Sequence, residues 1–397
     1  MSRAVGTVVR GLRTPIFTEN DNLLDLVPDI LIKASQIENF EFNDGDILAI
    51  TESVLARTQG NYVSVADIAA EVKSKLNGSR TVGLTFPILS RNRFASLLEG
   101  MAKAVDEVII QLSYPADEVG NHLFDANLLY EKNINPWQDV LTEQQFLDIF
   151  GTSKHPFTGI DYVALYKSIV EQQGATCTIL FSNDIREILK HTKTVICCDI
   201  HTRKQSKRIL KAKDHDLVLG LDDLMNEPSE HHGYNPEYGL LGSNKASTSS
   251  VKLFPRDSQL LVDRLAKILY ERTQKRIEVM VYGDGAFKDP IGKIWELADP
   301  VVSPAYTDGL KGTPEELKIK YLADNEFGNL NKEQQEAAIK ERLKNKEKRL
   351  DAEAAVGTTP RHIPDLLGSL ADLTSGSGDK GTPLVFIQGY FDNYSEN

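Results

Sequence analysis

Apolar and polar residues alternate along the first part of the chain in patterns typical of strands and helices. β-branched residues at 5–10 predict a strand, and the apolar spacing within 22–37 predicts a helix with one apolar face. A turn at 44–46 leads into a second predicted strand at 47–51. Strands that are separated by helices in this way favour an α/β fold.

The same alternation continues in the middle of the chain. Helices at 161–172 and 184–191 alternate with strands at 175–181 and 194–200, and a basic helix follows. This order predicts a mainly parallel sheet with helices layered on it.

Polar residues follow both of these strands. Ser182, Asn183 and Asp184 come after the first strand, and Asp199 comes after the second. The carboxyl ends of parallel strands carry ligand contacts in many α/β proteins, but Ser, Asn and Asp also stand there as helix N-caps. We expect N-caps, which are the commoner case.

The last part of the chain combines regular elements with a charged stretch. Residues 313–355 are highly charged, with a thin apolar seam at Ile339, Leu343 and Leu350. This pattern predicts a solvated helical arm, with a partner-binding surface as the alternative. The other elements predicted here are an amphipathic helix within 253–270 capped by Asp257 or Ser258, a strand over 277–281, a helix at 365–373, a loop at 374–382 and a strand at 384–388.

Length, charge and composition narrow the class of protein. A chain of 397 residues favours two lobes, or one domain with a large insertion. The 45 basic and 57 acidic side chains give a net charge of −12, which disfavours nucleic-acid binding. The apolar runs are too short to span a bilayer, and three cysteines are too few for a disulfide framework. We therefore expect a soluble cytoplasmic α/β protein that binds neither nucleic acid nor membrane.

Common chemical motifs are absent from the sequence, which contains no Walker A pattern, dinucleotide fingerprint, CxxC pair or HExxH. Residues 197–201 (Cys-Cys-Asp-Ile-His) look metal-binding, but adjacent cysteines at the end of a buried strand are more often core residues. His231 and His232 lack further ligands at suitable spacing, so we expect an exposed loop pair.

Two loops are better candidates for chemistry. The loop at 282–290 follows a strand and carries two aspartates and a lysine, which suit a divalent cation that bridges phosphate oxygens. An ordinary acidic turn explains this loop equally well. The loop at 375–382 is rich in glycine, so its backbone N–H groups can surround an anion, and Lys380 adds a positive charge. Its alternative is a flexible surface hairpin.

Four separated segments resemble the coenzyme F-420 γ-glutamyl ligase family. Each motif is weak alone, and their common order carries the resemblance over roughly half of the chain. The segments are residues 14–23, similar to the family's opening strand and GDDL turn; residues 44–60, similar to DGDVLVV…VVSKAEG; residues 232–257 and on to Asp284, similar to HGF…GIDxSN followed by SDTFGRP; and residues 365–389, similar to AD…A…LVMGE…GxPVVxxRG.

The resemblance implies a fold and a domain organisation. Residues 1–99 and 236–397 would form a discontinuous core with a mixed sheet, like that of the γ-glutamyl ligases. An alternating βα region at 100–235 would be inserted into this core. The charged helical arm at 313–355 would lie within the C-terminal half of the core.

The resemblance also implies an activity, namely nucleotide-dependent amide formation. A terminal carboxylate is phosphorylated by ATP or GTP with Mg²⁺ or Mn²⁺, and the amine of glutamate or a similar amino acid then displaces phosphate. The large insertion suggests an acceptor other than the deazaflavin cofactor. Because some relatives resemble enzymes of folate synthesis, a pterin-linked benzoate is one such acceptor. The dimeric habit of the family implies a homodimer.

Site residues follow from the same resemblance. Asp284, Arg57 and Lys288 are the implied catalytic residues, with Arg57 in place of the family's phosphate-binding lysine, and Asp284 and Asp289 are the implied metal ligands. The implied nucleotide-binding residues are Thr14, Pro15, Ile16, Phe17, Thr51, Arg57, Ser243, Asn244, Gly376, Ser377, Gly378, Asp379, Lys380, Gly381 and Thr382.

The chain departs from the family pattern at three positions. Leu241 replaces the first metal aspartate, Gly285 replaces a threonine, and Ser377 replaces the acidic residue of the MGE loop. Two expected metal oxygens are therefore missing, although Mg²⁺ needs only one or two carboxylates. The carboxylates that can substitute are those of Glu237, Asp289 or Asp379.

These departures leave two alternatives to a ligase. One is a non-catalytic ligand-binding protein that keeps the fold with a degenerate metal site. The other is a phosphate-handling hydrolase that uses Asp284 and Asp289 around a metal ion.

Overall fold

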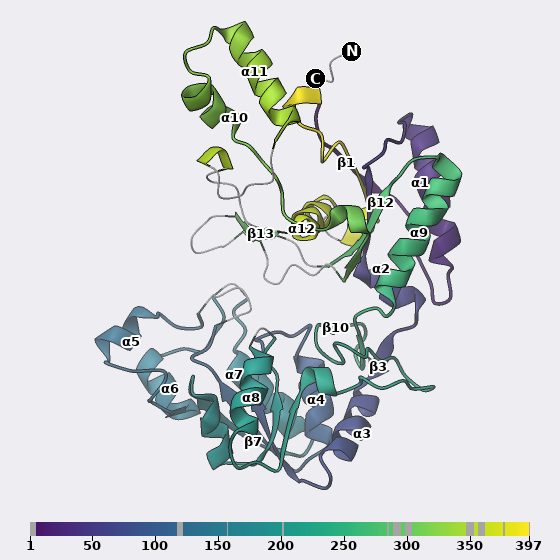
Figure 1. Cartoon of the computed structure of the whole chain (residues 1–397). Coiled ribbons are helices and arrows are strands. Elements are labelled where there is room, and N and C mark those ends of the chain that lie inside the picture. The colour runs from purple at the N-terminus through teal and green to yellow at the C-terminus, as the bar shows by residue number, and fades with distance from the viewer. Residues whose placement is uncertain are drawn as a thin grey trace. The chain divides into compact units, whose positions relative to one another are not determined.

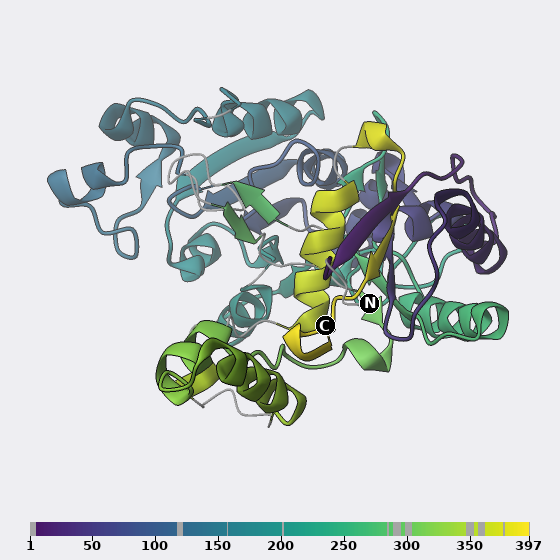
Figure 2. The same cartoon turned by 90° about the horizontal axis from the view of Figure 1, so that it is seen from above.

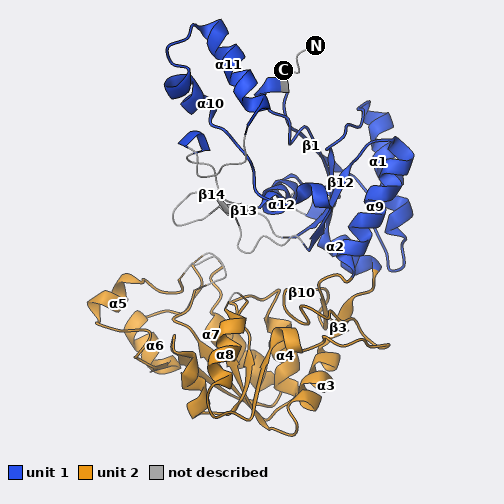
Figure 3. Ribbon diagram, in the orientation of Figure 1, with its two compact units in different colours: residues 1–58, 257–397 blue, residues 59–256 orange. Residues whose placement is uncertain are grey.

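The chain divides into two compact units in the computed structural model. Unit 1 comprises residues 1–58 and 257–397, and unit 2 comprises residues 59–256 (Figure 3). The structure describes residues 5–116, 122–156, 158–200, 202–283, 286–288, 295–297, 304–346, 353–355, 362–375 and 378–396.

Unit 1 is built on a five-stranded mixed sheet. β2 and β12 are parallel, and the other neighbouring strands are antiparallel. In spatial order the strands are β1 (Val8–Leu12), β16 (Leu384–Gln388), β2 (Ile47–Thr51), β12 (Glu278–Tyr282) and β15 (Ala305–Tyr306).

Helices cover both faces of this sheet. Alternate side chains of a strand point to opposite faces, so Leu48 and Ile50 pack in one core with α1 (Leu23–Glu38) and α9 (Ser258–Thr273). Ile47 and Ala49 pack in the other core, which includes residues of α12 (Ile363–Ser375). Figure 1 shows α1 and α9 together, and Figure 2 shows α12 beside β1. The central strands are buried on both faces, so β12 is buried at every position and its polar Glu278 is not solvated.

The carboxyl ends of three strands meet at one edge of the unit 1 sheet. Leu12 pairs with Leu384, and Leu384 pairs with Ile50, so β1 and β2 end where β16 begins. β12 runs parallel to β2 and ends at the same edge, where Tyr282 pairs with Thr51. Loops from both ends of the chain are thereby brought together.

The charged segment of unit 1 forms a helical arm with a small core of its own. It contains α10 (Ile319–Tyr321), a π-helical turn (Leu322–Glu326) and α11 (Lys332–Lys344). The predicted seam residues Ile339 and Leu343 are buried there together with Leu322 and Ala354, while Leu350 lies outside the described residues.

Unit 2 is built on a six-stranded sheet that is parallel except at one edge. Five strands are parallel, and β6 is antiparallel to its neighbour β7. In spatial order the strands are β6 (Leu141–Thr142), β7 (Thr176–Phe181), β5 (Glu107–Leu112), β4 (Thr81–Thr85), β8 (Thr194–Cys197) and β9 (Leu217–Gly220).

Helices lie on both faces of the unit 2 sheet as well. One core contains residues of α3 (Val65–Lys75), α4 (Ala95–Lys103) and α7 (Tyr162–Gln172). The core on the other face contains residues of α8 (Arg203–Lys211) and of the 3₁₀ turn Ile185–Lys190. The chain builds β5 and β7 on one side of β4 and then returns to build β8 and β9 on the other, so the strand order reverses between β4 and β8.

Smaller elements complete the two units. They are α2 (Glu52–Thr58), β13 (Ala286–Lys288), β14 (Trp295–Leu297) and the 3₁₀ turns Asp308–Leu310, Glu353–Ala355, Gly378–Lys380 and Tyr394–Glu396 in unit 1, and β3 (Tyr62–Ser64), α5 (Asn127–Glu131), α6 (Glu143–Phe150), the 3₁₀ turn Leu221–Asp223, β10 (Asn244–Lys245) and β11 (Ser250–Lys252) in unit 2.

The structure confirms the α/β class and the mainly parallel middle region, and it corrects two details. The predicted helix at 184–191 is the 3₁₀ turn Ile185–Lys190, a kind of helix that often serves as a short connector. The strand predicted at 194–200 ends at Cys197. Across the described parts of the chain, every helix is too short or too polar to cross a membrane.

The unit boundaries also differ from those expected at 99/100 and 235/236. The chain passes from one unit to the other at 58/59 and 256/257. The reason is that β4 and α3 build the unit 2 sheet and its helical layer, and that β3 pairs with β11 in a second small sheet of that unit.

Candidate functional site

A cavity of ≈ 460 Å³ opens at the edge of the unit 1 sheet where the strand ends meet. This volume lies in the range of small-molecule sites. The residues that line it are Thr14, Pro15, Ile16, Phe17, Thr51, Ser53, Val54, Arg57, Tyr282, Asp372, Ser375, Gly378, Gly381, Thr382 and Pro383.

The loop that follows β1 forms one wall of this cavity and is fixed by two hydrogen bonds. The Thr14 backbone N–H donates to the Gly381 carbonyl over 3.1 Å. Arg57 Nε donates to the Phe17 carbonyl over 2.6 Å. Phe17 is buried in the core below, whereas Ile16 is 84% exposed at the wall. The loop is therefore anchored at both ends and leaves an apolar side chain available to a ligand.

Arg57 supplies positive charge to the cavity. It lies in the last turn of α2, which follows β2 without a break. Among the described residues that line the cavity it is the sole basic one, and its side chain is exposed. Only its Nε is used by the Phe17 carbonyl, so the two terminal guanidinium nitrogens remain suited to the paired oxygens of a phosphate or carboxylate.

Tyr282 forms part of the cavity wall from the end of β12. It is 1% exposed, and burial raises the pKa of its hydroxyl to about 12, against a lowering effect of Ser375 and with a further rise from Asp372. The hydroxyl is therefore protonated at neutral pH and suited to donate a hydrogen bond.

The glycine-rich loop, which is hydrogen-bonded to the loop after β1, forms another part of the wall. Thr382 Oγ1 donates to the Ser375 carbonyl over 3.1 Å, and the Thr51 N–H donates to the Pro383 carbonyl over 3.0 Å. Gly381 has φ +66°, a conformation that L side chains rarely adopt, and a Cβ on Gly378 would meet no atom within 4 Å. At Gly378 and Gly381 this part of the wall therefore presents backbone without a side chain.

Several residues implied by the sequence come together around this cavity. They are the four residues Thr14 to Phe17, with Thr51, Arg57, Gly378, Gly381 and Thr382. Asp379 and Lys380 belong to the 3₁₀ turn Gly378–Lys380, are exposed and do not line it.

Other lining residues were missed by sequence reasoning. They are Ser53, Val54, Tyr282, Asp372, Ser375 and Pro383. Two signals were available, since Tyr282 opens one of the candidate loops and Ser375 opens the other. Asp372 had no such signal, because it lies within a regular helix.

The remaining predicted site residues fall into two groups. Asp284, Asp289, Gly376 and Ser377 lie outside the described residues, and Lys288 is described only as the last residue of β13. Ser243 and Asn244 belong to unit 2 and are absent from the cavity lining of unit 1. In the described portion of the chain, three or more His, Cys, Asp or Glu side chains nowhere gather in a way that suits a metal ion.

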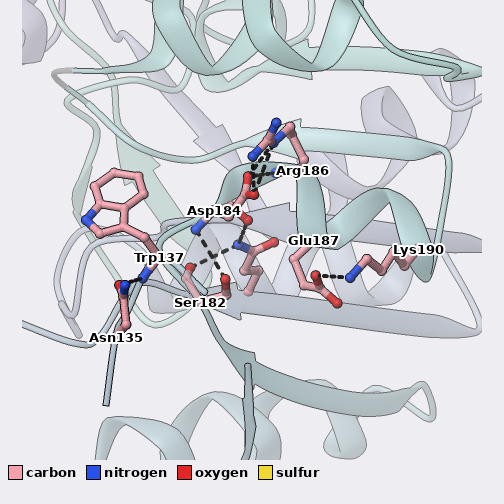
Figure 4. Close-up of polar contacts among 8 residues, drawn as sticks. Asn135, Trp137, Ser182, Asp184, Arg186, Glu187 and Lys190 are labelled. Carbon is pink, nitrogen blue, oxygen red and sulfur yellow. Dashed lines mark hydrogen bonds and ion pairs between the residues drawn. The ribbon is translucent and has the colours of Figure 1, made fainter. Parts of the chain in front are cut away.

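Of the polar residues after β7 in unit 2, Asp184 is an N-cap, as expected, and it caps the 3₁₀ turn Ile185–Lys190. Asp184 Oδ1 accepts a hydrogen bond from the Arg186 N–H over 3.0 Å, and its carboxylate pairs with the Arg186 guanidinium (Figure 4). The Asp184 N–H is bonded to Ser182 Oγ over 3.2 Å. The hydrogen bond with the Arg186 side chain is the main cause that lowers the pKa of Asp184. These groups are hydrogen-bond partners of one another, so their arrangement needs no ligand to account for it.

Asp199 is not the N-cap that was expected after β8, because the N-cap of α8 is Thr202. Asp199 Oδ2 accepts hydrogen bonds from the Thr202 and Ser206 hydroxyls, whereas its buried Oδ1 has no hydrogen-bond partner among the described residues, and burial raises its pKa. Cys197 and Cys198 are completely buried in the apolar cores on the two faces of the sheet, which agrees with their expected role as core residues.

Unit 1 is therefore an α/β unit with a cavity of small-molecule size at the carboxyl ends of its strands. The family model described as F420-0:Gamma-glutamyl ligase matches residues 11–389, and the chain belongs to this family of ligases. The match spans nearly the whole chain, including the region that we expected to be an insertion. A comparison with curated proteins gives no match.

Proposed function

We propose that this protein is a nucleotide-dependent ligase that joins glutamate, or a similar amino acid, to a carboxylate acceptor. The observation that carries the proposal is the unit 1 cavity, in which Arg57 and the glycine-rich 378–382 loop lie at one sheet edge. Family membership supports the amide-forming chemistry, and the cavity supports the nucleotide.

The cavity suits the phosphates of ATP or GTP. Arg57 neutralises the charge of phosphate oxygens. Because glycine has no side chain, the backbone N–H groups of the 378–382 loop can come close to those oxygens. Pro15 and Ile16 offer an apolar surface to the rest of the nucleotide.

A divalent cation fits this donor set in part. Asp372 is the carboxylate among the described lining residues, and Tyr282 precedes Asp284 by two residues. Asp372 and Asp284, with Asp289, would hold Mg²⁺ or Mn²⁺, since Mg²⁺ uses one or two carboxylates together with phosphate oxygens. When bound, the ion screens the phosphate charge.

The proposed reaction has two steps, and in each step one bond forms as another breaks. An oxygen of the acceptor carboxylate attacks the γ-phosphorus, the bond to the nucleoside diphosphate breaks, and an acyl phosphate forms. The amine of glutamate then attacks the acyl carbon, loses a proton and expels phosphate. Arg57 stabilises charge on the transferring phosphoryl group, and the Tyr282 hydroxyl donates a hydrogen bond to one of its oxygens.

The acceptor and the assembly are further parts of the proposal. The acceptor is the deazaflavin cofactor precursor or a pterin-linked benzoate, which differ in their ring but share a terminal carboxylate. The functional form is proposed to be a homodimer in the cytoplasm.

The first test measures nucleotide binding by isothermal titration calorimetry of the full chain with ATP or GTP and Mg²⁺. We expect saturable heat with one of them, and heat from neither, at protein concentrations well above micromolar, would contradict the proposal. Asp284→Ala should abolish turnover while the melting temperature changes by only a few degrees, since this substitution removes no buried apolar group.

A product assay separates the proposal from its alternatives. A ligase releases phosphate only when both acceptor and amine are present, and it yields the amide. A hydrolase releases phosphate without the amine. A binding protein retains ligand affinity and gives neither product across a panel of carboxylates and amines.

A further inference from the structure

A second cavity of unit 1 lies at the other end of β12. The cavity described above opens beside Tyr282, the last residue of this strand, whereas the second cavity is lined by Glu278, the first residue. The strand has five residues, so its two ends lie about 13 Å apart. Among the described residues, none lines both cavities. We call the second one the amino-end cavity, and what binds there does not depend on the proposed ligase reaction.

The amino-end cavity has the size of a small-molecule site. Its volume is ≈ 470 Å³, which is enough for a whole small molecule. Figure 1 shows α9 beside β12, and the cavity lies where these two elements meet the residues that follow β15. The residues that line it are Ala266, Tyr270, Arg276, Ile277, Glu278, Thr307, Asp308 and Gly309.

The carboxylate of Glu278 is almost completely buried at the wall of this cavity. The residue is 8% exposed, and its Oε2 accepts a hydrogen bond from the Thr307 hydroxyl. Among the described residues, none donates a hydrogen bond to Oε1. The backbone of Gly309 lies directly against this oxygen, since a Cβ there would collide with it. A buried carboxylate is costly unless it is fully paired, so Oε1 favours a cationic hydrogen-bond donor.

Arg276 places a positive charge beside this carboxylate without enclosing it. Its Nε lies 3.7 Å from Glu278 Oε1, which is close enough for an ion pair but too long for a hydrogen bond. The Arg276 side chain is 76% exposed, and its backbone N–H is fixed by Asp44 Oδ1 over 2.7 Å. In the described part of the chain, no hydrogen bond uses its two terminal nitrogens. These nitrogens can therefore receive the paired oxygens of a carboxylate.

Two opposite charges thus stand side by side on the cavity wall. An α-amino acid has the same arrangement at neutral pH, because its ammonium group and its carboxylate are attached to one carbon. Glu278 repels a simple anion, and Arg276 repels a simple cation. A zwitterion pairs with both side chains at once and leaves their contact with each other in place. The charges of the wall therefore favour an amino acid over a ligand with a single charge.

The apolar part of the lining indicates the kind of side chain that the amino acid carries. Ala266 and Ile277 line the cavity together with Tyr270 of α9. Tyr270 is 54% exposed, so its ring is available to a ligand. An exposed aromatic ring at a cavity provides a surface on which an apolar or aromatic group can pack.

The remaining charge of the lining disfavours an acidic side chain. Asp308 lines the cavity and is paired with Lys311, which lies outside the lining, over 2.6 Å. Arg276 is the one basic side chain among the described lining residues, and the α-carboxylate of an amino acid occupies it. An acidic side chain would therefore face Asp308 without a cation of its own.

We propose that the amino-end cavity binds an α-amino acid with an apolar or aromatic side chain. The ammonium group of the amino acid donates a hydrogen bond to Glu278 Oε1, and its carboxylate accepts hydrogen bonds from the terminal nitrogens of Arg276. Its side chain packs against the Tyr270 ring, Ala266 and Ile277.

The test is isothermal titration calorimetry of the full chain with three probes that share a phenyl ring. L-Phenylalanine carries both charges, phenethylamine lacks the carboxylate, and 3-phenylpropionate lacks the ammonium group. We expect saturable heat with L-phenylalanine and about tenfold lower affinity for each analogue, because each loses its hydrogen bonds to one charged side chain. No saturable heat with L-phenylalanine, or equal affinity for either analogue, would overturn the proposal. L-Glutamate should bind more weakly than L-phenylalanine, and equal affinity would contradict the assignment of an apolar side chain.

Two variants and a matched control locate the binding. Glu278→Gln keeps an acceptor for the Thr307 hydroxyl and removes the negative charge, and Arg276→Gln removes the positive charge. Each should lower the affinity for L-phenylalanine by about tenfold. Arg264→Gln removes an exposed arginine of α9 that does not line the cavity, and it should bind like the unaltered chain. An equal loss in Arg264→Gln would mean that the effect of charge is general and would contradict the proposal.

A further variant separates the two cavities of unit 1, because the proposed reaction also uses an amino acid. Arg57→Ala alters the cavity beside Tyr282, so binding of L-phenylalanine should persist in it. Loss of binding in Arg57→Ala, with binding retained in Arg276→Gln, would assign the amino acid to that cavity and refute the proposal. Should Glu278→Gln fail to fold, Arg276→Gln still decides the outcome, since its side chain is largely exposed.

Discussion

The two units differ in the size of the cavity at the edge of the sheet where the strands end. At the carboxyl ends of the strands, unit 1 has a cavity of ≈ 460 Å³, whereas unit 2 has one of ≈ 20 Å³. In unit 1 the walls combine loops that contain glycine, threonine and proline with residues of α2, β12 and α12. In unit 2 the small cavity is lined mainly by leucine, isoleucine and phenylalanine residues. The comparison indicates that the order of the strands determines where a cavity forms. The residues that follow the strands determine how large that cavity is.

The largest effect on stability is expected from substitutions in the apolar cores of the two units. Leu265 in unit 1 and Leu98 in unit 2 are both completely buried, in cores whose residues each come from one unit. Leu265→Ala and Leu98→Ala should each cost about 2–5 kcal/mol of folding free energy. Hydrogen exchange followed by mass spectrometry should show faster exchange mainly in the substituted unit. Equal acceleration in both units would mean that the cores unfold together.

Substitution of the cavity arginine should have the next largest effect. Arg57→Ala removes the one described cation of the unit 1 cavity, so we expect nucleotide affinity to fall by about 1.5–3 kcal/mol in calorimetric titrations. Arg57→Lys should restore part of this loss, because charge returns without the fork geometry. Arg13→Ala is the matched control, since Arg13 is exposed and outside the lining. An equal loss in the control would indicate a general charge effect.

Removal of the buried hydroxyl should have a smaller effect. Tyr282→Phe keeps the ring in the core and removes one donor, so kcat/KM for amide formation should fall several-fold, by about 1 kcal/mol. The pKa of about 12 keeps this hydroxyl protonated, so the loss should be constant across neutral pH. Tyr306→Phe, which alters a tyrosine of the same core outside the cavity, should retain full activity. An equal loss in Tyr306→Phe would remove Tyr282 from the proposed mechanism.

The smallest expected effect concerns the capped network of unit 2. Because the Arg186 side chain lowers the pKa of Asp184, the charged form stabilises the fold at pH values above the ordinary value of 3.8. This contribution is lost as the pH falls below that value and through the lowered pKa of the folded state. Asp184→Asn should therefore destabilise the protein by about 0.2–1 kcal/mol at neutral pH, and less in acid, in urea titrations. A difference that persists undiminished in acid would contradict this account.

Much of the fold could be predicted because its central strands are strongly apolar. Residues 47–51 and 384–388 were predicted with the bounds that the structure gives. The 3₁₀ turn Ile185–Lys190 was expected as an α-helix, since a short apolar segment with an N-cap looks the same in sequence for both. The unit boundaries could not be predicted, because the pairing of β3 with β11 depends on residues far apart in the chain.

The candidate site was predictable where a loop carried unusual composition. The glycine-rich loop was singled out because its composition is visible in sequence, whereas Arg57 was named only by the family resemblance, and residues of both line the unit 1 cavity. Asp372 and Val54 were not found, since each has an ordinary place in a helix and reaches the cavity only through tertiary packing. Ser243 was grouped with the nucleotide residues by resemblance, while the structure describes it in unit 2.

The pairing of β1 with β16 has a consequence for synthesis on the ribosome. All of unit 2 is translated before β12 and β16 emerge, so it can fold while the unit 1 sheet still lacks its partner strands. The strand β1 cannot pair with β16 until residues 384–388 have been synthesised, and during that interval its apolar residues lack their native partners. A message truncated before codon 384 would yield a folded unit 2 joined to an incomplete sheet with an exposed edge.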